Sequence, residues 1–372
     1  MQVERLKLNY FRNYESLRLA PGGGLNVIFG ENAQGKTNAV EAVFLCAFGR
    51  SHRTPRDAEL ISSGMSGAYV GLDVMTRAGS RSVEVKLRDG ERKQLFIDKA
   101  ACERSGELMG VLNVVMFSPE DLELVKGGPA ERRRFLDMEL SQFRPAYYFA
   151  LQRYNKALRE RNALLRPEAV KERTGEALRR ELYVWDEQLI TLGADIMQRR
   201  AEFIGKLAAI AARLHREISG GRESLALAYD PNVKPNGGGL EEAFADALYG
   251  GVAEDIRRGY TNSGPHRDDV AVSLSGGSVR TFGSQGQQRT AALSVKLSEL
   301  ELLREDRGEP PVLLLDDVLS ELDELRQRAL FEAMHDCQSF LTCVSLEGLK
   351  RAGMDMSNIP AFLCKNGTLT AV

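Results

Sequence analysis

The sequence has few of the residues that build metal centres or disulfide frameworks. It contains five cysteines, none of them in a CxxC pair, and four histidines that lie far apart. This scarcity argues against a zinc site and indicates a reduced protein with buried thiols. The chain also lacks an apolar run close to the roughly eighteen residues that a membrane span needs, and its first residues show no signal-peptide pattern. We therefore expect a cytoplasmic protein with no membrane partner.

Charge of neither sign dominates the 372 residues, whose net charge is −2, but the charges are unevenly placed. Residues 1–117 carry a net +3, residues 129–216 a net +6 and residues 263–372 a net −5. A basic middle segment beside an acidic end suits a protein that presents a positive face to a polyanion. A solvated helical surface explains the same pattern equally well, so both interpretations stay open.

The hydrophobic pattern divides the chain into three parts. Residues 1–117 read as an α/β segment, and residues 263–372 return to the same pattern. Between them, residues 118–262 carry apolar residues at helical spacing, including a helix of roughly forty residues. We expect two long helices, joined near residues 166–167, to form an antiparallel hairpin. Predicted strands cover 3–8, 25–29, 69–75, 82–87, 94–97, 270–274, 312–315, 340–344, 361–364 and 368–371, and predicted helices cover 285–304 and 321–335.

Residues 30–37, GENAQGKT, fit the phosphate-binding pattern G-x-x-x-x-G-K-[ST]. A short apolar strand precedes them and an apolar helix follows, which is the context that the pattern requires. Gly30 and Gly35 let the backbone curl so that its N–H groups face phosphate oxygens. Lys36 then supplies a charge at the β- and γ-phosphates, and the Thr37 hydroxyl is suited to hold Mg²⁺. A solvent loop capping an ordinary helix is the weaker alternative.

A second motif is the apolar run at 312–315 that ends in Asp316 and Asp317. A buried parallel strand delivers such side chains at its carboxyl end, where ligands bind in open α/β sheets. Asp316 is suited to the Mg²⁺ shell, and Asp317 to polarising an attacking water. Alone, the run could be any strand that ends in a turn, but the phosphate loop favours the catalytic interpretation.

Two further segments read as helix starts. Ser284 is a natural N-cap before a helix, and Gly286 lets the backbone approach an anion there. Residues 320–323, SELD, resemble a second cap with acidic first-turn residues. A plain helix cap remains the alternative for both.

Taken in order, these motifs resemble the ATPase head of the ABC superfamily: a Walker A loop, the signature SQGQQ at 284–288, a Walker B strand and the D-loop SELD. The resemblance is strongest to the SMC-type heads and to the branch of them that serves bacterial recombination. It rests on LNYFRNYESLRL, FGENAQGKTNAVEAVFL, GRSHRT, FSPEDLELVKGGPAERRRFLD and SGPHRDD, which cover most of the chain.

The resemblance implies a fold, a ligand set and a dimer. The fold is an α/β, ABC/SMC-like P-loop ATPase head at 1–117 and 263–372 with an inserted, mainly helical arm at 118–262. Two heads would close on ATP and Mg²⁺, with Ser284, Gly286 and Gln287 contacting the γ-phosphate of the partner's nucleotide. The ATP contacts within one chain would be Gly30, Glu31, Asn32, Ala33, Gln34, Gly35, Lys36, Thr37, Arg12 and Asn13.

The resemblance also implies a role in DNA replication, DNA damage repair and the SOS response. Such proteins bind duplex DNA next to single-stranded gaps and, with RecO and RecR, help to load RecA. Their ATP hydrolysis is slow and DNA-stimulated, and it releases the clamp. A transporter ATPase subunit would lack the basic arm, and a structural SMC protein would need a far longer coil.

The chain departs from the superfamily pattern at several positions. Asp317 stands where a glutamate is usual, which weakens water activation and fits a switch better than a pump. Gln285 replaces a glycine of the signature. No clear glutamine follows the strand near 117–120, and no histidine follows 340–344, where Thr342 or Ser345 could substitute.

The DNA-contacting residues are predicted from charge alone. Arginines cluster after the phosphate-loop helix and at the start of the arm, and guanidinium groups suit phosphate contacts without base readout. Ion pairs on an amphipathic helix explain the arm cluster equally well. The candidates are Arg50, Arg53, Arg56, Arg132, Arg133 and Arg134.

Overall fold

The computed structural model describes residues 1–172, 174–235, 237–351 and 354–372. They form two compact units. The first unit comprises Met1–Leu122, Glu217–Gly220 and Ala292–Val372, and the second comprises Glu123–Arg216 and Gly221–Ala291. Residues 263–291, which we expected in the ATPase head, thus group with the helical arm. The limits of the ATPase head that we predicted, at residues 117 and 263, stay a prediction.

The first unit contains a mostly parallel sheet in the order β15-β14-β3-β13-β12-β8. Strands β3, β13, β12 and β8 run parallel to one another, and β15 is antiparallel to β14. The four strands β3, β13, β12 and β8 are almost entirely buried, as expected for a sheet covered on both faces, whereas β15 is largely exposed. Their bounds are β3 (Leu25–Phe29), β8 (Val114–Phe117), β12 (Val312–Asp316), β13 (Ser339–Cys343), β14 (Ala361–Lys365) and β15 (Thr368–Ala371).

An antiparallel sheet in the order β2-β1-β4-β5-β6-β7 forms the other layer of this unit. Helix α1 (Lys36–Phe48) contacts strands of both sheets, which explains why it is buried on nearly all sides. The apolar pattern that follows the phosphate loop therefore belongs to a helix enclosed between two sheets. The strands are β1 (Gln2–Phe11), β2 (Tyr14–Leu19), β4 (Gly67–Thr76), β5 (Gly79–Arg88), β6 (Gln94–Ile97) and β7 (Ala100–Ala101).

Three longer helices complete the first unit: α9 (Gln285–Arg307), whose first seven residues count with the second unit, α10 (Glu324–Met334) and α11 (Leu346–Arg351). The helix that we predicted over 321–335 is divided, because Leu322 is extended and Asp323 caps α10 with its side chain. The short 3-10 turns are η1 (Asp57–Leu60), η2 (Ser105–Leu108), η3 (Pro119–Leu122) and η5 (Val318–Glu321).

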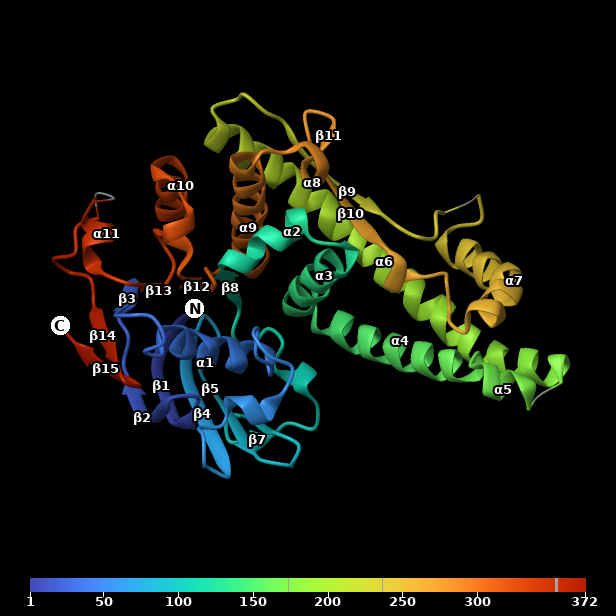
Figure 1. The fold of residues 1–372 in the computed structure, drawn as a ribbon, viewed down its shortest axis with the longest axis horizontal. Helices are drawn as coiled ribbons and strands as arrows, with labels where there is room; N and C mark the ends of the chain where they lie inside the picture. The colour runs from blue at the N-terminus through green and yellow to red at the C-terminus, as the bar shows by residue number, and fades with distance from the viewer. Residues whose placement is uncertain (173, 236, 352–353) are drawn as a thin grey trace. The chain divides into compact units, whose positions relative to one another are not determined.

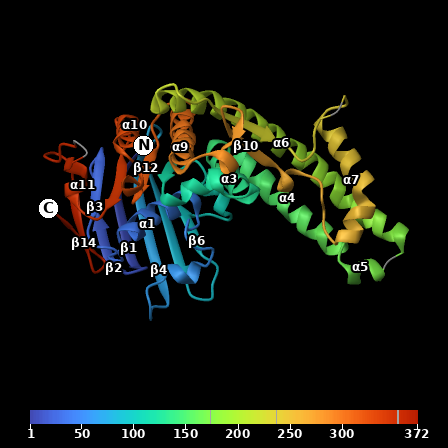
Figure 2. The same ribbon diagram turned by 45° about the horizontal axis from the view of Figure 1, so that its top comes forward.

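The second unit is the helical arm, and its main part is a pair of antiparallel helices (Figures 1 and 2). Helix α4 runs from Pro145 to Leu164, and α6 runs over 45 residues from Gly175 to Ser219. Contacts of Arg161 with Asp186, and of Tyr147 with Arg200, fix their antiparallel direction. The predicted hairpin is confirmed, with the short helix α5 (Pro167–Lys171) after α4.

The long helix passes through its two glycines without a break. Gly193 is required by packing, since a Cβ there would lie 2.4 Å from Cε1 of Phe244, whereas a Cβ at Gly205 would meet no atom within 4 Å. The remaining arm elements are α2 (Glu123–Lys126), α3 (Pro129–Phe143), β9 (Leu225–Asp230), α7 (Leu240–Arg258), η4 (Pro265–Arg267), β10 (Asp269–Leu274), β11 (Gly277–Ser278) and α8 (Val279–Phe282).

Buried charges hold the arm together. Arg200 has a side chain that is 1% exposed, and it donates to Asp268, Asp137 and the Pro265 carbonyl. Arg161, fully buried, likewise bonds Asp186 and Asp255. Each carboxylate offsets the cost of desolvating the guanidinium that it meets.

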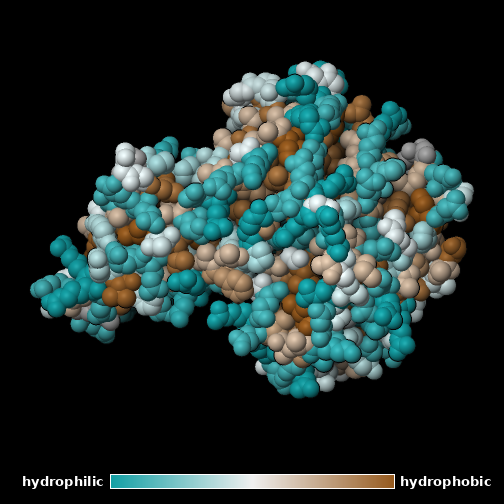
Figure 3. Space-filling view, turned by 180° about the vertical axis from the view of Figure 1, so that it is seen from behind, coloured by the Kyte–Doolittle hydropathy of each residue, from teal (hydrophilic) through white to brown (hydrophobic). Residues whose placement is uncertain are grey.

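Strands 14–19, 114–117 and 225–230 and helices 129–143 and 240–258 were absent from the prediction, while every predicted strand is present. Among the helices of the described residues, none combines the length and the apolar character of a membrane span. The face shown in Figure 3 is mostly hydrophilic, with small separate hydrophobic patches.

Candidate nucleotide site

The phosphate loop lies where the pattern predicts, between the end of β3 and the start of α1. Gly30 adopts φ 149°, and a Cβ there would lie 2.4 Å from the carbonyl oxygen of Cys364. Gly35 adopts φ 116°, and its Cβ would lie 2.6 Å from the Asn13 amide. Both glycines are therefore required by backbone conformation and by close neighbours.

Residues from both ends of the chain brace this loop. The side-chain amide of Asn13 donates to the Gln34 carbonyl at 2.7 Å, and the backbone N–H of Gly367 donates to the same oxygen at 3.2 Å. The Tyr14 hydroxyl donates to the Gly35 carbonyl at 3.0 Å. Cys364 also lies 3.3 Å from the Gln34 carbonyl. We had not predicted roles for Tyr14, Cys364 or Gly367, because they form no pattern with the loop in sequence.

Lys36 points into the loop. Its ammonium donates to the carbonyls of Gly30 at 2.7 Å and Glu31 at 2.8 Å, and the residue is 7% exposed. Residues 31–33 are exposed, and Ala33 takes the left-handed conformation at φ 63°. A curled backbone with a lysine inside it is the geometry that cradles a polyphosphate.

Asp316, the last residue of β12, meets the first turn of the helix after the phosphate loop. Asp316 accepts hydrogen bonds from the Thr37 hydroxyl at 2.9 Å and from the Thr342 hydroxyl at 2.7 Å. A hydroxyl and a carboxylate held together at the strand ends form the oxygen donor set that Mg²⁺ prefers beside phosphate. Thr37 and Asp316 therefore fit this ion, which would neutralise phosphate charge when bound.

Asp317 follows in the left-handed conformation, with φ 50°. Its backbone N–H donates to the Thr342 hydroxyl at 2.9 Å, so Thr342 is tied to both acids of the pair. Burial raises the pKa of the Asp317 carboxyl. The positive charge of Lys36 works to lower this pKa, and the negative charges of Asp316 and Glu321 work to raise it further. A carboxylate with a raised pKa is a stronger base toward water.

The Arg12 guanidinium, whose contact with ATP stays a prediction, is bonded within the chain. It donates to both carboxylate oxygens of Glu41, at 2.9 and 2.7 Å, and to the Glu59 carbonyl at 2.8 Å. Burial works to raise the pKa of Glu41, but hydrogen bonds from Arg12 and Ser51 outweigh it, so this pKa is lowered. In the structure Arg12 thus anchors α1, and Asn13 is the member of the pair that contacts the phosphate loop.

The signature loop at 284–288 lies in the second unit and forms a reciprocal cap. The Ser284 N–H donates to the side chain of Gln287 at 2.7 Å, and the Gln287 N–H donates to the Ser284 hydroxyl at 3.3 Å. The Gln287 amide also donates to Glu223 at 2.7 Å. Ser284 is exposed and Gly286 is half-buried at the start of α9. Their contact with a partner's nucleotide stays a prediction.

The predicted DNA-contacting arginines differ in exposure. Arg50, Arg53, Arg56 and Arg134 are exposed. Arg132 contradicts the prediction: it is 7% exposed, and its guanidinium is held by Asp269 at 2.7 and 2.9 Å and by the Gly127 carbonyl. Arg133 donates to the Asp268 carbonyl at 2.7 Å, and burial lowers its pKa. Arg132 and Arg133 are thus bonded within the arm, by residues that follow 137 and 135 positions later in the sequence.

The fold and the loop geometry together define a P-loop ATPase head of the ABC/SMC type with an inserted helical arm. Residues 2–362 match the model of the RecF/RecN/SMC N terminal domain. The head of an Smc protein from Pyrococcus furiosus is similar in fold, with a TM-score of 0.57 and 15% identity, and this match covers 100% of our chain and 96% of that one.

Similarities to individual proteins identify the family within this class of ATPase heads. The chain is 44% identical over 354 residues to the DNA replication and repair protein RecF of Alkaliphilus oremlandii, covering 94% of our chain and 95% of that protein. It is 43% identical to the RecF of Halothermothrix orenii, covering 100% and 99%. A solved structure of the recombination mediator protein RecF with ATP in the RecFOR pathway matches with a TM-score of 0.90 and 34% identity, covering 100% and 97%. The chain belongs to the RecF family.

Proposed function

We propose that this protein is an ATP-gated, dimerising DNA clamp of recombinational repair. The observation that carries the proposal is the contact of Thr37 with Asp316, which joins the phosphate loop to the acidic strand end beside Asp317. Two such heads would enclose two nucleotides, each bound by the phosphate loop of one copy and by Ser284, Gly286 and Gln287 of the other. Binding duplex DNA beside single-stranded gaps, the closed dimer would assist RecO and RecR in loading RecA in the cytoplasm.

The residues suggest a slow hydrolysis that opens the clamp. Lys36 and the loop amides hold the β- and γ-phosphates, while Thr37 and Asp316 suit the accompanying Mg²⁺. Asp317 accepts a proton from the water whose oxygen attacks the γ-phosphorus, and the bond to the β,γ-bridging oxygen breaks, leaving ADP and phosphate. Because Asp317 is shorter than the usual glutamate, we infer a weak, DNA-stimulated turnover that acts as a switch.

Dimerisation is tested by placing a bulky charge at the predicted shared site. Ser284→Arg should leave ATP binding intact but abolish the ATP-dependent dimer in sedimentation velocity experiments, with and without gapped DNA. Ser357→Arg, which adds the same side chain at another exposed position, should dimerise like the unmodified protein. A Ser284→Arg protein that dimerises normally would overturn the shared-site proposal.

Hydrolysis is tested at the base and at the phosphate loop. Asp317→Asn should retain ATP and trap the closed dimer, with phosphate release reduced on the order of a hundredfold, because the general base is lost. Lys36→Arg should impair ATP binding or hydrolysis, because the longer, planar guanidinium cannot take the place of the ammonium inside the loop. Unchanged turnover in Asp317→Asn would remove this carboxylate from the reaction.

A further inference from the structure

We propose that one face of the arm docks a protein partner that presents apolar and basic side chains. This tyrosine face comprises Tyr183 and Val184 of α6 and Tyr249, Gly250 and Gly251 of α7. The inference rests on the proposed function, because it assigns a surface and a chemistry to a recombination partner of the clamp. The tyrosine face contains none of the predicted nucleotide or DNA contacts.

The tyrosines form an ordered aromatic surface that is open to solvent. Tyr183 is 54% exposed, Val184 56% and Tyr249 42%. The two rings stack with centroids 6.2 Å apart and an interplanar angle of 12°, and the Tyr249 hydroxyl donates to Glu187 at 2.7 Å. Fixed tyrosines offer a large contact area at a small cost in conformational entropy, which is why they recur at the centres of protein interfaces.

Two adjacent glycines in the middle of α7 provide an independent observation. A Cβ at Gly250 or Gly251 would meet no heavy atom within 4 Å, and neither residue has a positive φ. The fold therefore requires glycine at neither position, unlike Gly193, whose Cβ would collide with Phe244. Glycine weakens a helix interior relative to alanine. Beside Tyr249, it leaves a shallow place where another backbone can approach closely.

The charge around the tyrosine face selects the kind of partner. Residues 181–198 of α6 and 241–256 of α7 contain nine acidic residues. Arg180, Arg199, Arg257 and Arg258 flank these two ranges, and the last three pair with Asp195 or Glu254. Asp186 and Asp255 are buried in ion pairs with Arg161, while Glu187, Glu241, Glu242 and Asp246 are exposed. Such a surface repels the phosphate backbone of DNA and attracts lysine and arginine side chains. A basic and apolar protein surface is the complementary occupant.

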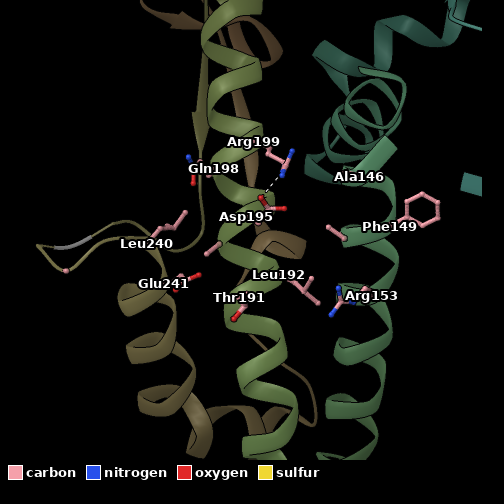
Figure 4. Close-up of a pocket in the computed structure, with 13 residues that line it drawn as sticks. Ala146, Phe149, Arg153, Thr191, Leu192, Asp195, Gln198, Arg199, Leu240 and Glu241 are labelled. Atoms are coloured by element: carbon pink, nitrogen blue, oxygen red, sulfur yellow. Dashed lines mark hydrogen bonds and ion pairs between the residues drawn. The ribbon is translucent and has the colours of Figure 1, made fainter. Parts of the chain in front are cut away.

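A cavity on the same helices extends this surface. It encloses about 890 Å³ between α4, α6 and the start of α7, and Figure 4 shows Thr191 and Asp195 of α6 facing it. Residues 184, 188, 191, 195 and 198 follow each other at spacings of three and four, so they lie along one stripe of α6. Leu240 and Glu241 of α7 line the cavity as well, together with Arg153 of α4 and Arg199 of α6, which pairs with Asp195. A partner side chain can thus be anchored beside the tyrosines.

The test uses the full-length protein with purified RecO and RecR as separate probes in biolayer interferometry. We expect one of them to bind, with an affinity reduced at least tenfold by Tyr183→Ala and by the double change Gly250→Ala, Gly251→Ala. The glycine variant should at the same time melt about 2 °C higher than the unmodified protein, because alanine stabilises the helix. Gly205→Ala is the matched control: it removes a glycine with equally open space from α6, and should leave the affinity unchanged.

Several outcomes overturn the proposal. The proposal fails if neither probe binds, or if both variants bind the probe with unchanged affinity. It also fails if the variants lose duplex DNA binding instead of partner binding. It fails as well if what the variants lose is self-association of the protein at high concentration, since the arm face would then bind a second copy. Each variant is also tested for its ATP-dependent dimer. A normal dimer with unaltered partner affinity refutes only the docking surface, whereas absence of the dimer in the unmodified protein refutes the clamp.

Discussion

The phosphate loop of the first unit and the core of the arm use charged side chains differently. Around the phosphate loop of the first unit, Lys36, Thr37 and Asp316 bond the backbone or each other at the edge of a sheet, with groups directed toward a site for an anion. In the arm, Arg161 and Arg200 are buried and each is bonded to carboxylates. The role of an arginine in this protein therefore depends on the groups that bond its guanidinium.

This difference bears on the two clusters of arginines that we predicted as DNA contacts. Both clusters were candidates in the sequence, but their surroundings differ in the structure. Arg53 and Arg56 have side chains that are 44% and 80% exposed, and they remain candidates for phosphate contacts. Arg132 pairs with Asp269, 137 residues later, and its charge is neutralised inside the arm. Arg53 and Arg56 also have acidic neighbours, Glu41 and Glu59, both at 3.6 Å, but their guanidinium groups stay open to solvent. Exposure of the charge, more than the absence of an acidic neighbour, therefore separates the two clusters.

The largest expected effect comes from breaking the buried charge network. Arg200→Ala leaves Asp268 and Asp137 without their cation, and should lower the free energy of unfolding by about 3–5 kcal/mol. Arg199→Ala, at the neighbouring position, removes a half-exposed pair with Asp195 and should cost about 0–1 kcal/mol. Urea denaturation of the two variants measures the contrast. Equal losses would mean that burial does not separate the two arginines.

An intermediate effect is expected where the phosphate loop is braced. Gly367 has φ 69°, and a Cβ there would lie 2.0 Å from the Asn13 carbonyl oxygen, whereas Gly90 has φ 73° and open space. Gly90→Ala should cost about 1–2 kcal/mol through backbone strain alone. Gly367→Ala adds a clash of about 1–3 kcal/mol and should also weaken ATP binding. Calorimetric titration with ATP measures the affinity of each variant for the nucleotide. Equal affinities of the Gly367→Ala and Gly90→Ala variants would show that the contact of Gly367 does not shape the phosphate loop.

The smallest effect is a pH dependence in the arm. Burial, with the charges of Arg267 and Arg133, lowers the pKa of His266 to about 4. Because the unfolded chain binds this proton near pH 6.5, stability should fall by at most about 1.4 kcal/mol per pH unit as the pH drops from 6.5 toward 4. His266→Gln should flatten this slope in urea titrations. His335→Gln changes an exposed histidine and should keep the slope; a slope that survives His266→Gln would assign it elsewhere.

The local parts of the nucleotide site could be predicted from the sequence, and the long-range parts could not. The strand, glycine loop and helix at 25–48 are contiguous, and the apolar run before Asp316 reveals a buried strand without its neighbours. The brace from Tyr14 and Gly367 and the capture of Arg12 by Glu41 depend on tertiary contacts. Strand β9 was missed because its partner, β10, is distant in the sequence. Strand β10 begins 39 residues after the end of β9, and helix α7 lies between them.

The hydrogen bonds from Gly367 and Cys364 to the loop around Gln34 have a consequence for biosynthesis. The ribosome adds Cys364 to the chain 330 residues after Gln34 of the phosphate loop that it contacts. Strand β14, which pairs with β3 beside the loop, belongs to the same later segment. A nascent polypeptide that has not yet reached residues 364–367 lacks these braces, so we expect it to hold nucleotide less tightly than a chain that includes them.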